Sequence, residues 1–253
     1  MNQLMKLLAD NRGRGLFKAE AGGGDEATLY LYDAIVSDAW YGGVAAVDFV
    51  KQLNSIEAAT IHLRINCPGG EVFAGQAMAQ AIREHPANII AHVDGYAASA
   101  ASWLALACDE VLISEGGYFM IHKAMTVAWG NADEFRKQVD LLDKIDATLV
   151  AGYAKETGQD EAQIADWMAA ETWFNAAEAV EYGFADRIAE GAAKKNLAAW
   201  NLAAWQKAPA VEAGSEPRIP MTSPSPPSST PPNTSAGASR WSRNKLPERS
   251  RAK

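Results

Sequence analysis

Hydrophobic residues recur along the first 190 positions with two spacings, one typical of strands and one typical of helices. Segments rich in β-branched and aromatic residues predict strands over 28–36, 60–66, 88–93, 110–113 and 118–122. Apolar residues spaced three or four apart, or runs of small residues, predict helices over 44–56, 72–84, 97–107, 132–156, 162–170 and 176–182. Strands that alternate with helices favour βαβ units, so we expect an α/β fold with a largely parallel sheet.

The composition is that of a globular chain with one sizeable core or at most two small domains. Of the 253 residues, 48% are hydrophobic and 21% are charged, and the formal net charge is −8. No apolar run approaches the ~18–20 residues that span a bilayer, and the apolar patch near the N-terminus is too short for a signal peptide. Cys67 and Cys108 form neither a disulfide framework nor a zinc-binding spacing. We therefore expect a reduced, cytoplasmic protein with no metal site and no membrane partner.

Charge and proline content change near position 207. Residues 1–206 hold 15 lysines and arginines against 28 acidic residues, whereas residues 207–253 hold 8 against 3 and nine of the 11 prolines fall between 209 and 247. The second part is also rich in serine and threonine, so we expect a disordered basic tail over 208–253. Because the body is acidic, we expect no nucleic-acid partner.

Between the body and the tail, the five residues NLAAW occur twice in succession, at 196–200 and 201–205. A period of five moves around a helix and does not form one apolar face. We expect a duplicated helical spacer over 191–207 and assign it no function. Ahead of this spacer, we expect the α/β domain over 28–190 and an N-terminal extension over 1–27.

Two candidate chemical features follow the ends of predicted strands, where ligands collect in parallel α/β folds. Gly69 and Gly70 leave backbone amides free to face an anion, although a plain turn is the simpler explanation. Ser99 lies at the start of a small-residue helix, near the positive end of the helix dipole. The alternative is that Ser99 and the nearby Ser102 are polar residues within a tightly packed helix.

A third feature is His122, which stands where a predicted strand meets a connection, whereas the other three histidines lie within strands or at a helix end. A lone histidine is more often structural than catalytic, but its near-neutral pKa suits a general base that deprotonates a serine hydroxyl. An acid would orient such a base. The candidates are Asp166, Glu171 and Asp186, and spacing alone does not choose among them.

Taken together, these segments resemble the Clp-type serine peptidase family. Residues 66–70 (NCPGG) are similar to that family's Asn-Ser-Pro-Gly-Gly turn, and residues 95–99 (GYAAS) to its nucleophile motif. Residues 120–122 (MIH) match its Met-Ile-His motif, and residues 177–183 (AEAVEYG) resemble its Pro-Glu-Ala-Val-Glu-Tyr-Gly segment. Four motifs in the same order imply the ClpP/crotonase-like fold, a spiral of ββα units with a long handle helix, here 132–156.

The resemblance also implies a catalytic site. Ser99 would be the nucleophile and His122 the base, while the amides of Gly70 and Ala100 would form the oxyanion hole. The family's acidic position falls on Glu171, where most members carry aspartate. The implied reaction is acyl transfer from a peptide bond to serine and then to water, with no cofactor. Two seven-membered rings joined through the handle helix would enclose the sites.

Other segments resemble the Clp-related proteases of phages and prophages, which process capsid and scaffold proteins during head maturation. These segments are 27–35, 40–43 and 171–174. We therefore expect a head maturation protease. The alternative within the family is a housekeeping proteolytic subunit that works with an ATP-driven AAA+ unfoldase. The alternatives of another class are a crotonase-like acyl-CoA enzyme and an inactive structural subunit.

Overall fold

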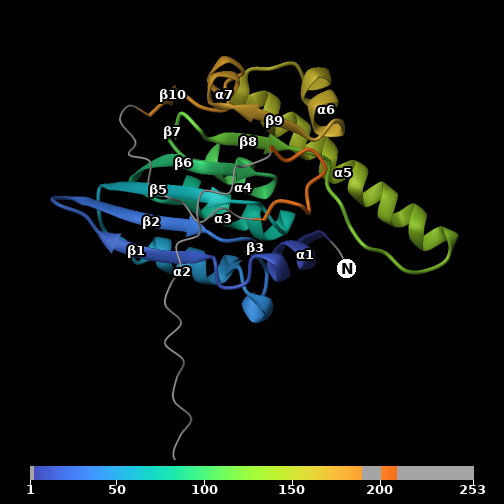
Figure 1. Ribbon diagram of the computed structural model, residues 1–253, viewed down its shortest axis with the longest axis horizontal. Helices are drawn as coiled ribbons and strands as arrows, with labels where there is room; N and C mark the ends of the chain where they lie inside the picture. Colours follow the sequence, from blue (N-terminus) through green and yellow to red (C-terminus); the bar gives the residue numbers. More distant parts are fainter. Residues whose placement is uncertain (1–2, 190–200, 210–253) are drawn as a thin grey trace, which may run out of the picture. The chain divides into compact units, whose positions relative to one another are not determined.

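The computed structural model describes residues 3–189 and 201–209, in which an eight-stranded sheet forms the centre of the fold (Figure 1). Six strands follow the order β1–β2–β5–β6–β7–β10, and β8 pairs with β6 and with β9. Of the strand pairs in the described part of this sheet, only β1–β2 and β8–β9 are antiparallel, so the predicted, largely parallel sheet is confirmed. The strands are β1 (Leu16–Ala21), β2 (Glu26–Tyr32), β5 (Thr60–Cys67), β6 (Asn88–Ala98), β7 (Glu110–Ile113), β8 (Tyr118–Ile121), β9 (Thr172–Asn175) and β10 (Arg187–Ile188).

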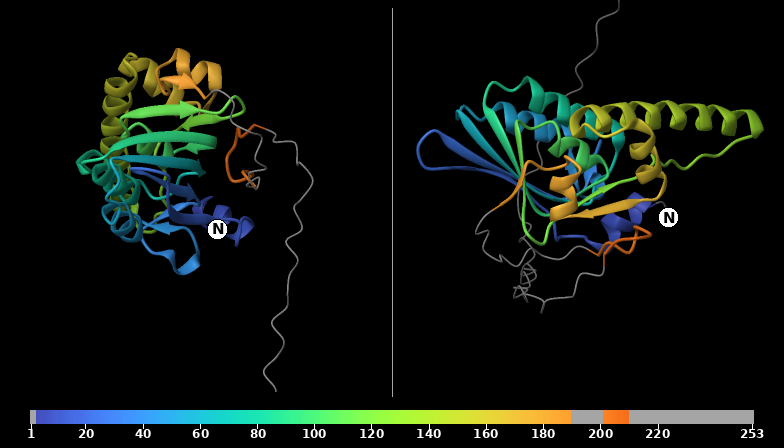
Figure 2. Two further views of the ribbon diagram at one scale, coloured as in Figure 1. Left: turned by 90° about the vertical axis from the view of Figure 1, so that its left-hand side faces the viewer. Right: turned by 90° about the horizontal axis from the view of Figure 1, so that it is seen from above.

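Helices cover one face of this sheet, while α1 and residues 201–209 lie against the other face (Figure 2). The short strands β3 (Ile35–Val36) and β4 (Val44–Ala45) form a separate parallel pair, joined by a 3-10 turn at Ala39–Tyr41. The helices are α1 (Gln3–Asp10), α2 (Ala46–Asn54), α3 (Val72–Glu84), α4 (Ala100–Ala105), α5 (Ala132–Thr157), α6 (Glu161–Ala169) and α7 (Ala176–Glu181).

Alternating side chains of the strands enter two separate apolar cores. In β8, Phe119 and Ile121 point into the main core beneath the helices, whereas Met120 points into the second core on the opposite face. We use the term second core for the buried set Leu7, Leu8, Ala34, Val36, Tyr96, Ala98, Met120, Leu202 and Trp205. The second core therefore joins both ends of the described chain to the strand ends of the sheet.

Leu63 of β5 lies in the main core with 1% of its surface exposed. We expect Leu63→Ala to lower the free energy of unfolding by about 2–5 kcal/mol, because it removes buried methyl groups and leaves a cavity. Urea denaturation followed by circular dichroism measures the change. Val47→Ala, on the exposed face of α2, is the control and should change stability by about 0.5 kcal/mol or less. Equal losses in the two variants would contradict the assignment of the core.

One difference from the predicted elements lies at β6. The sequence predicts a strand over 88–93 and a helix from position 97, whereas β6 continues to Ala98 and α4 begins at Ala100. The small residues after Val93 favoured a helix locally, but they pair with β8 once β7 has ended. Tertiary strand pairing therefore overrides the local pattern and places Ser99 at the end of a strand.

Both predicted flanking segments contribute to the described fold. Within 1–27, predicted as an extension, α1 enters the second core and β1 pairs with β2. The predicted helical spacer over 191–207 is wrong in its described part, because residues 201–207 form turns instead of a helix. The first copy of the repeat and residues 210–253 of the predicted tail lie outside the described residues.

The handle helix α5 is confirmed and is only partly covered by the rest of the chain. Asn131 and Glu134 form a reciprocal capping box at its N-terminus. Leu149 and Tyr153 are buried near its C-terminal end, whereas Phe135 and Val139 are 48% and 55% exposed. Figure 1 shows the N-terminal half of α5 extending beyond the sheet. This half therefore exposes apolar side chains among its charged residues.

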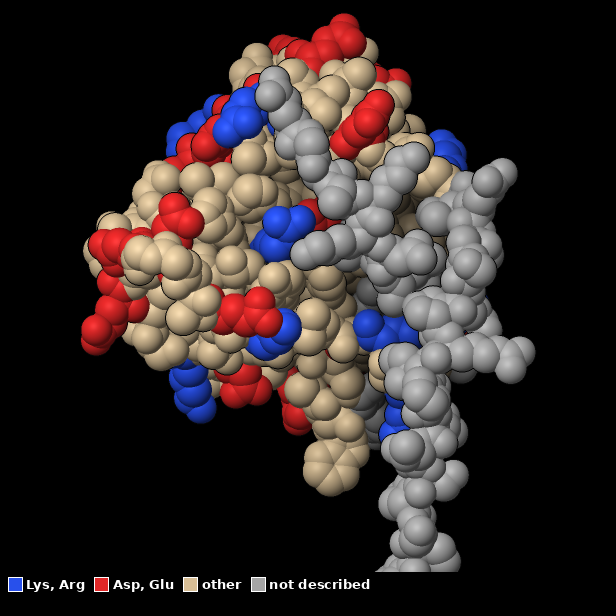
Figure 3. Space-filling view, turned by 60° about the vertical axis from the view of Figure 1, so that its left-hand side comes forward, with Lys and Arg blue, Asp and Glu red and all other residues tan. Residues whose placement is uncertain are grey.

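Charges of both signs mix on the surface shown in Figure 3, where most of the described atoms are neither acidic nor basic. That face shows no continuous stripe of lysine and arginine among the described residues. No helix of the described residues combines the length and apolar character of a membrane span.

Candidate active site

Ser99 occupies a sharp junction between β6 and α4. Its backbone adopts φ 55° and ψ −124°, a conformation that is rare for a residue other than glycine. The Ser99 amide donates to the carbonyl oxygen of Met120 at 2.8 Å, which ties the junction to β8. Backbone strain of this kind costs about 1–3 kcal/mol and persists where the surrounding structure enforces it. The strand pairing thus holds the half-buried Ser99 side chain in a fixed position.

The structure brings Ser99 and His122 together, with 2.7 Å between Ser99 Oγ and His122 Nε2. His122 follows the last residue of β8, so two adjacent strand ends present the pair. The next two residues are also held, because the Lys123 amide donates to the Met168 carbonyl oxygen and the Ala124 amide to Asp146 Oδ1. Asp146 lies on α5 and thereby helps to position the histidine. No sequence motif identifies this contact, which joins positions 22 residues apart.

Shielding from water lowers the pKa of His122 to about 4, because burial disfavours the charged imidazolium. The negative charge of Glu171 acts in the opposite direction and raises the pKa by a smaller amount. Above about pH 5 the imidazole is therefore neutral. With its proton on Nδ1, Nε2 is free to accept the proton of the Ser99 hydroxyl.

We expect the His122 ring to titrate near pH 4 in the full-length chain, well below the ordinary value of about 6.5 for histidine. Two-dimensional ¹H–¹³C NMR of the histidine side chains measures this midpoint. Burial also lowers the pKa of His92 to about 4, so comparison with the spectrum of His122→Gln assigns the signal. A midpoint for His122 at or above pH 6.5 would contradict the burial of its ring.

The Gly69–Gly70 turn packs directly against the serine. Gly69 has a φ of 90°, and a Cβ atom added there would lie 2.6 Å from Ser99 Cβ and 3.1 Å from the Ala100 amide nitrogen. Ile35 fixes the turn from the other side, because its amide donates to the Gly69 carbonyl oxygen and its carbonyl oxygen accepts from the Glu71 amide. Only glycine allows this close approach.

Two backbone amides remain available beside Ser99. Among the described residues, the Gly70 amide donates to no acceptor. Ala100 is the first residue of α4, where an amide has no acceptor within the helix. Two such donors next to a serine hydroxyl are the arrangement that stabilises an oxyanion.

The alternative nucleophile Ser102 is fully buried, at 0% exposed. Its hydroxyl donates to the Ser99 carbonyl oxygen at 2.6 Å and lies 2.8 Å from the Tyr153 hydroxyl. Cys67 is also buried, and burial raises the pKa of its thiol, so the thiol is protonated. Both side chains therefore support the site from within the core and face no solvent.

Glu171 lies near His122, but within the described part of the chain the two side chains form no hydrogen bond. Its carboxylate instead accepts from the amides of Gln206 and Lys207, at 3.2 and 2.7 Å, and from the Trp173 indole at 3.4 Å. The structure thus brings Glu171 close enough to act on His122 through its charge alone.

The other two acidic candidates are placed elsewhere. Asp186 Oδ2 accepts from the Val111 amide at 2.7 Å, which fixes the start of β7, and Asp166 lies within α6. Among the described residues, no group of three or more histidine, cysteine, aspartate or glutamate side chains could hold a metal ion.

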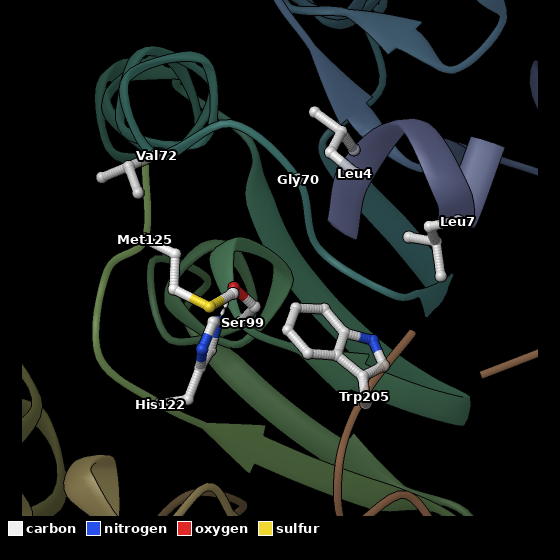
Figure 4. A pocket seen from close by; sticks show the side chains of 8 residues that line it. All are labelled: Leu4, Leu7, Gly70, Val72, Ser99, His122, Met125 and Trp205. Carbon is white, nitrogen blue, oxygen red and sulfur yellow. Dashed lines mark hydrogen bonds between the residues drawn. The ribbon is translucent and has the colours of Figure 1, made fainter. Parts of the chain in front are cut away.

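Two pockets adjoin the Ser99–His122 pair. The first extends toward α5 and is lined on that side by Trp103, Leu149 and Tyr153. The second is bounded by α1, the glycine turn and Trp205, and it is lined by Leu4, Leu7, Gly70, Val72, Ser99, His122, Met125 and Trp205. Figure 4 shows the side chains of Trp205 and Met125 beside the Ser99–His122 pair. Sequence reasoning missed Trp205 because its neighbours are distant along the chain.

Comparison with known proteins agrees with this geometry. Residues 25–192 match the family model described as Clp protease. The ATP-dependent Clp protease proteolytic subunit 2 of Treponema denticola is 32% identical over 147 residues, which cover 56% of this chain and 74% of the relative. The subunit of the same name from Pseudomonas aeruginosa is 31% identical over 166 residues, covering 58% and 77%.

Among solved structures, a mutant of ClpP1 from Listeria monocytogenes has the same fold, with a TM-score of 0.57 and 24% identity. The match covers 65% of this chain and 92% of that one. The predicted ClpP/crotonase-like α/β fold is thereby confirmed, and so is the resemblance seen in the motifs. The chain belongs to the Clp protease family.

Proposed function

We propose that this chain is a serine-type endopeptidase in which Ser99 is the nucleophile and His122 the general base. The observation that carries the proposal is the 2.7 Å contact between Ser99 Oγ and His122 Nε2 at a strained strand–helix junction. The lowered pKa of His122 supports it, because the ring is neutral at physiological pH. The amides of Gly70 and Ala100 are the proposed oxyanion donors.

In the proposed reaction, Ser99 Oγ bonds to the carbonyl carbon of a peptide while its proton passes to His122 Nε2. The carbonyl oxygen becomes an oxyanion held by the two amides, each typically worth about 3–4 kcal/mol in the transition state. The C–N bond then breaks, and His122 returns the proton to the leaving amine. Water attacks the resulting ester in the same way, releasing the acid and regenerating Ser99. No cofactor takes part in these steps.

Glu171 is the proposed acidic partner of the histidine, and its role differs from that of an aspartate in direct contact. Its negative charge raises the pKa of His122 and so stabilises the imidazolium that forms during attack. The contacts of its carboxylate with Gln206 and Lys207 keep it occupied in this structure.

A fluorophosphonate probe tests the nucleophile directly, because it forms a covalent bond with an activated serine. We expect labelling of the full-length chain at Ser99, identified by mass spectrometry, and no labelling of Ser99→Ala. Ser102→Ala should still be labelled, since that hydroxyl is buried. Absence of labelling from all three proteins, with size-exclusion chromatography showing folded chains, would remove the serine peptidase and favour a crotonase-like or structural role.

For the biological role, we propose processing of phage capsid or scaffold proteins, on the strength of the segments 27–35, 40–43 and 171–174. The second candidate is ATP-dependent proteolysis with an AAA+ unfoldase, which the names of the Treponema and Pseudomonas relatives favour. Incubation with capsid and scaffold proteins, with and without an unfoldase and ATP, separates them. Cleavage that requires the ATPase would overturn the first role.

We also propose that the protein works as a ring-shaped homo-oligomer that assembles through α5. The exposed Phe135 and Val139 support this, since an apolar helix face gains stability when a second copy covers it. Sizing of the labelled protein reports the nucleophile and the assembly together.

A further inference from the structure

Residues 201–209 cover the catalytic pair from the side of α1. The rings of Trp205 and His122 meet edge to face, with centroids 4.7 Å apart, and Trp205 is only 8% exposed. We propose that this segment is a tethered inhibitor, bound in a groove that recognises peptides of the form Asn-Leu-Ala-Ala-Trp. The inference rests on the proposed peptidase function, because it describes how that site is closed.

The first anchor of the segment is a pair of hydrogen bonds with Asn11, just after α1. The Asn201 amide donates to Asn11 Oδ1 at 2.6 Å, and Asn11 Nδ2 donates to the Asn201 carbonyl oxygen at 3.0 Å. Asn11 is buried and also donates to the Leu7 carbonyl oxygen, so its amide group is held in place. This two-way contact recognises the backbone of an incoming peptide and fixes its register.

The second anchor is apolar. Leu202 and Trp205 enter the second core with 6% and 8% of their surfaces exposed. A turn brings them to the same side, since the Trp205 amide donates to the Leu202 carbonyl oxygen at 2.8 Å. The Asn201 side chain supports the turn by accepting from the Ala203 amide. The motif thus meets the groove through the backbone of its asparagine and the side chains of its leucine and tryptophan.

The third anchor is the carboxylate of Glu171. Both of its carboxylate oxygens accept backbone amides of the segment, from Gln206 and Lys207, and the Lys207 ammonium group donates to the Ala170 carbonyl oxygen. The acid proposed to support His122 therefore also holds the inhibitor. Departure of the segment would free Glu171 and uncover the imidazole in one step.

Two observations indicate a segment that can be released. The indole Nε1 of Trp205 is buried without a hydrogen-bond partner among the described residues. Binding of the segment therefore leaves one buried donor unpaired, which lowers the stability of the bound state. Both α1 and residues 201–209 lie outside the stretch 25–192 that matches the Clp protease family. The segment and the helix that holds it therefore lie beyond the part of the chain that the family model describes.

The rate of labelling by a fluorophosphonate measures how often the site is open. We expect Trp205→Ala to react about tenfold faster than the unmodified chain, as when a site closed about nine-tenths of the time is released. Asn11→Ala, which removes the backbone anchor, should also react faster. Trp200→Ala is the matched control from the first copy of the repeat and should react at the unmodified rate. The double variant Trp200→Ala/Trp205→Ala should be at least as fast as Trp205→Ala.

A second measurement observes binding without catalysis. A fluorescein-labelled peptide of sequence NLAAWQKAP should bind the full-length Ser99→Ala/Trp200→Ala/Trp205→Ala protein, measured by fluorescence anisotropy. The same peptide with alanine in place of tryptophan should bind at least tenfold more weakly, if the apolar anchor contributes as expected for a buried aromatic ring. Unlabelled NLAAWQKAP should slow the labelling of the double variant.

The outcomes separate the two proposals. Labelling at equal rates in the unmodified chain, Asn11→Ala and Trp205→Ala would overturn the tethered inhibitor and leave the peptidase intact. Absence of labelling from every variant, together with specific peptide binding, would overturn the peptidase and retain the peptide groove. Failure of the peptide to bind would overturn the groove.

Discussion

Replacement of Ser99 or His122 by alanine is expected to lower kcat for peptide hydrolysis by about 10⁴- to 10⁶-fold, the loss typical of a nucleophile and base that act as a unit. The physical reason is their 2.7 Å contact: without the neutral imidazole the hydroxyl keeps its proton, and without the hydroxyl the imidazole has no nucleophile to activate. The double variant Ser99→Ala/His122→Ala should therefore hydrolyse peptides no more slowly than the slower of the two single variants. Hydrolysis of fluorescein-labelled casein measures kcat. The substitutions are compared in the unmodified chain and in the Trp205→Ala background.

His85→Ala is the matched control for the histidine substitution. His85 caps the end of α3 and accepts from the Ala87 amide, outside the pockets beside Ser99. Its replacement should leave kcat within about twofold of the starting value. Retention of more than about one tenth of the rate in Ser99→Ala, or losses that add in the double variant, would show that the pair does not work together.

Gly69→Ala is expected to lower kcat about 10²- to 10³-fold, the cost of losing one oxyanion donor. A methyl group at this position would lie 2.5 Å from the Ala98 carbonyl oxygen and 2.6 Å from Ser99 Cβ. The turn or the serine must therefore move, which displaces the Gly70 amide from the reacting oxygen. Steady-state kinetics at saturating casein measures kcat, and thermal denaturation reports separately whether the chain is folded.

Gly24→Ala provides the matched comparison. Gly24 has a φ of 74°, similar in sign to that of Gly69, but a Cβ atom there would meet nothing within 4 Å. Alanine at this position should cost about 1–2 kcal/mol of stability for its left-handed backbone and leave kcat unchanged. If Gly69→Ala lost only the stability that Gly24→Ala loses, with kcat intact, the turn would have no part in catalysis.

Local hydrophobic patterns were sufficient to predict the helices and strands that bury one regularly spaced apolar face. The helix predicted over 72–84 coincides with α3, and the strand predicted over 60–66 with β5 apart from one residue. Both have regular apolar spacing and clear ends, one before Pro86 and one before Pro68. The motifs at Ser99 and His122 were likewise visible, because each lies within a few residues of a strand end.

Long-range contacts could not be predicted from the sequence. Asn11 and Asn201 are 190 positions apart, and neither has a local pattern that indicates the other. The position of Glu171 could be found from its distance to the segment 177–183, but its engagement with Gln206 and Lys207 depends on how the segment 201–209 folds back. The repeat NLAAW predicted a helix because alanine and leucine favour one, whereas the second core favours a turn that buries Leu202 and Trp205 together.

The backbone of Ile35 connects the Gly69–Gly70 turn to the exposed connection between β3 and β4. Ile35 pairs with Val44 across the β3–β4 ladder, and the connection between these strands carries Trp40, which is 82% exposed. The same Ile35 backbone bonds the Gly69 carbonyl oxygen and the Glu71 amide on either side of Gly70. A displacement of the connection that carries Trp40 would thus act through the backbone of one residue, Ile35, on the turn that holds the proposed oxyanion donor Gly70.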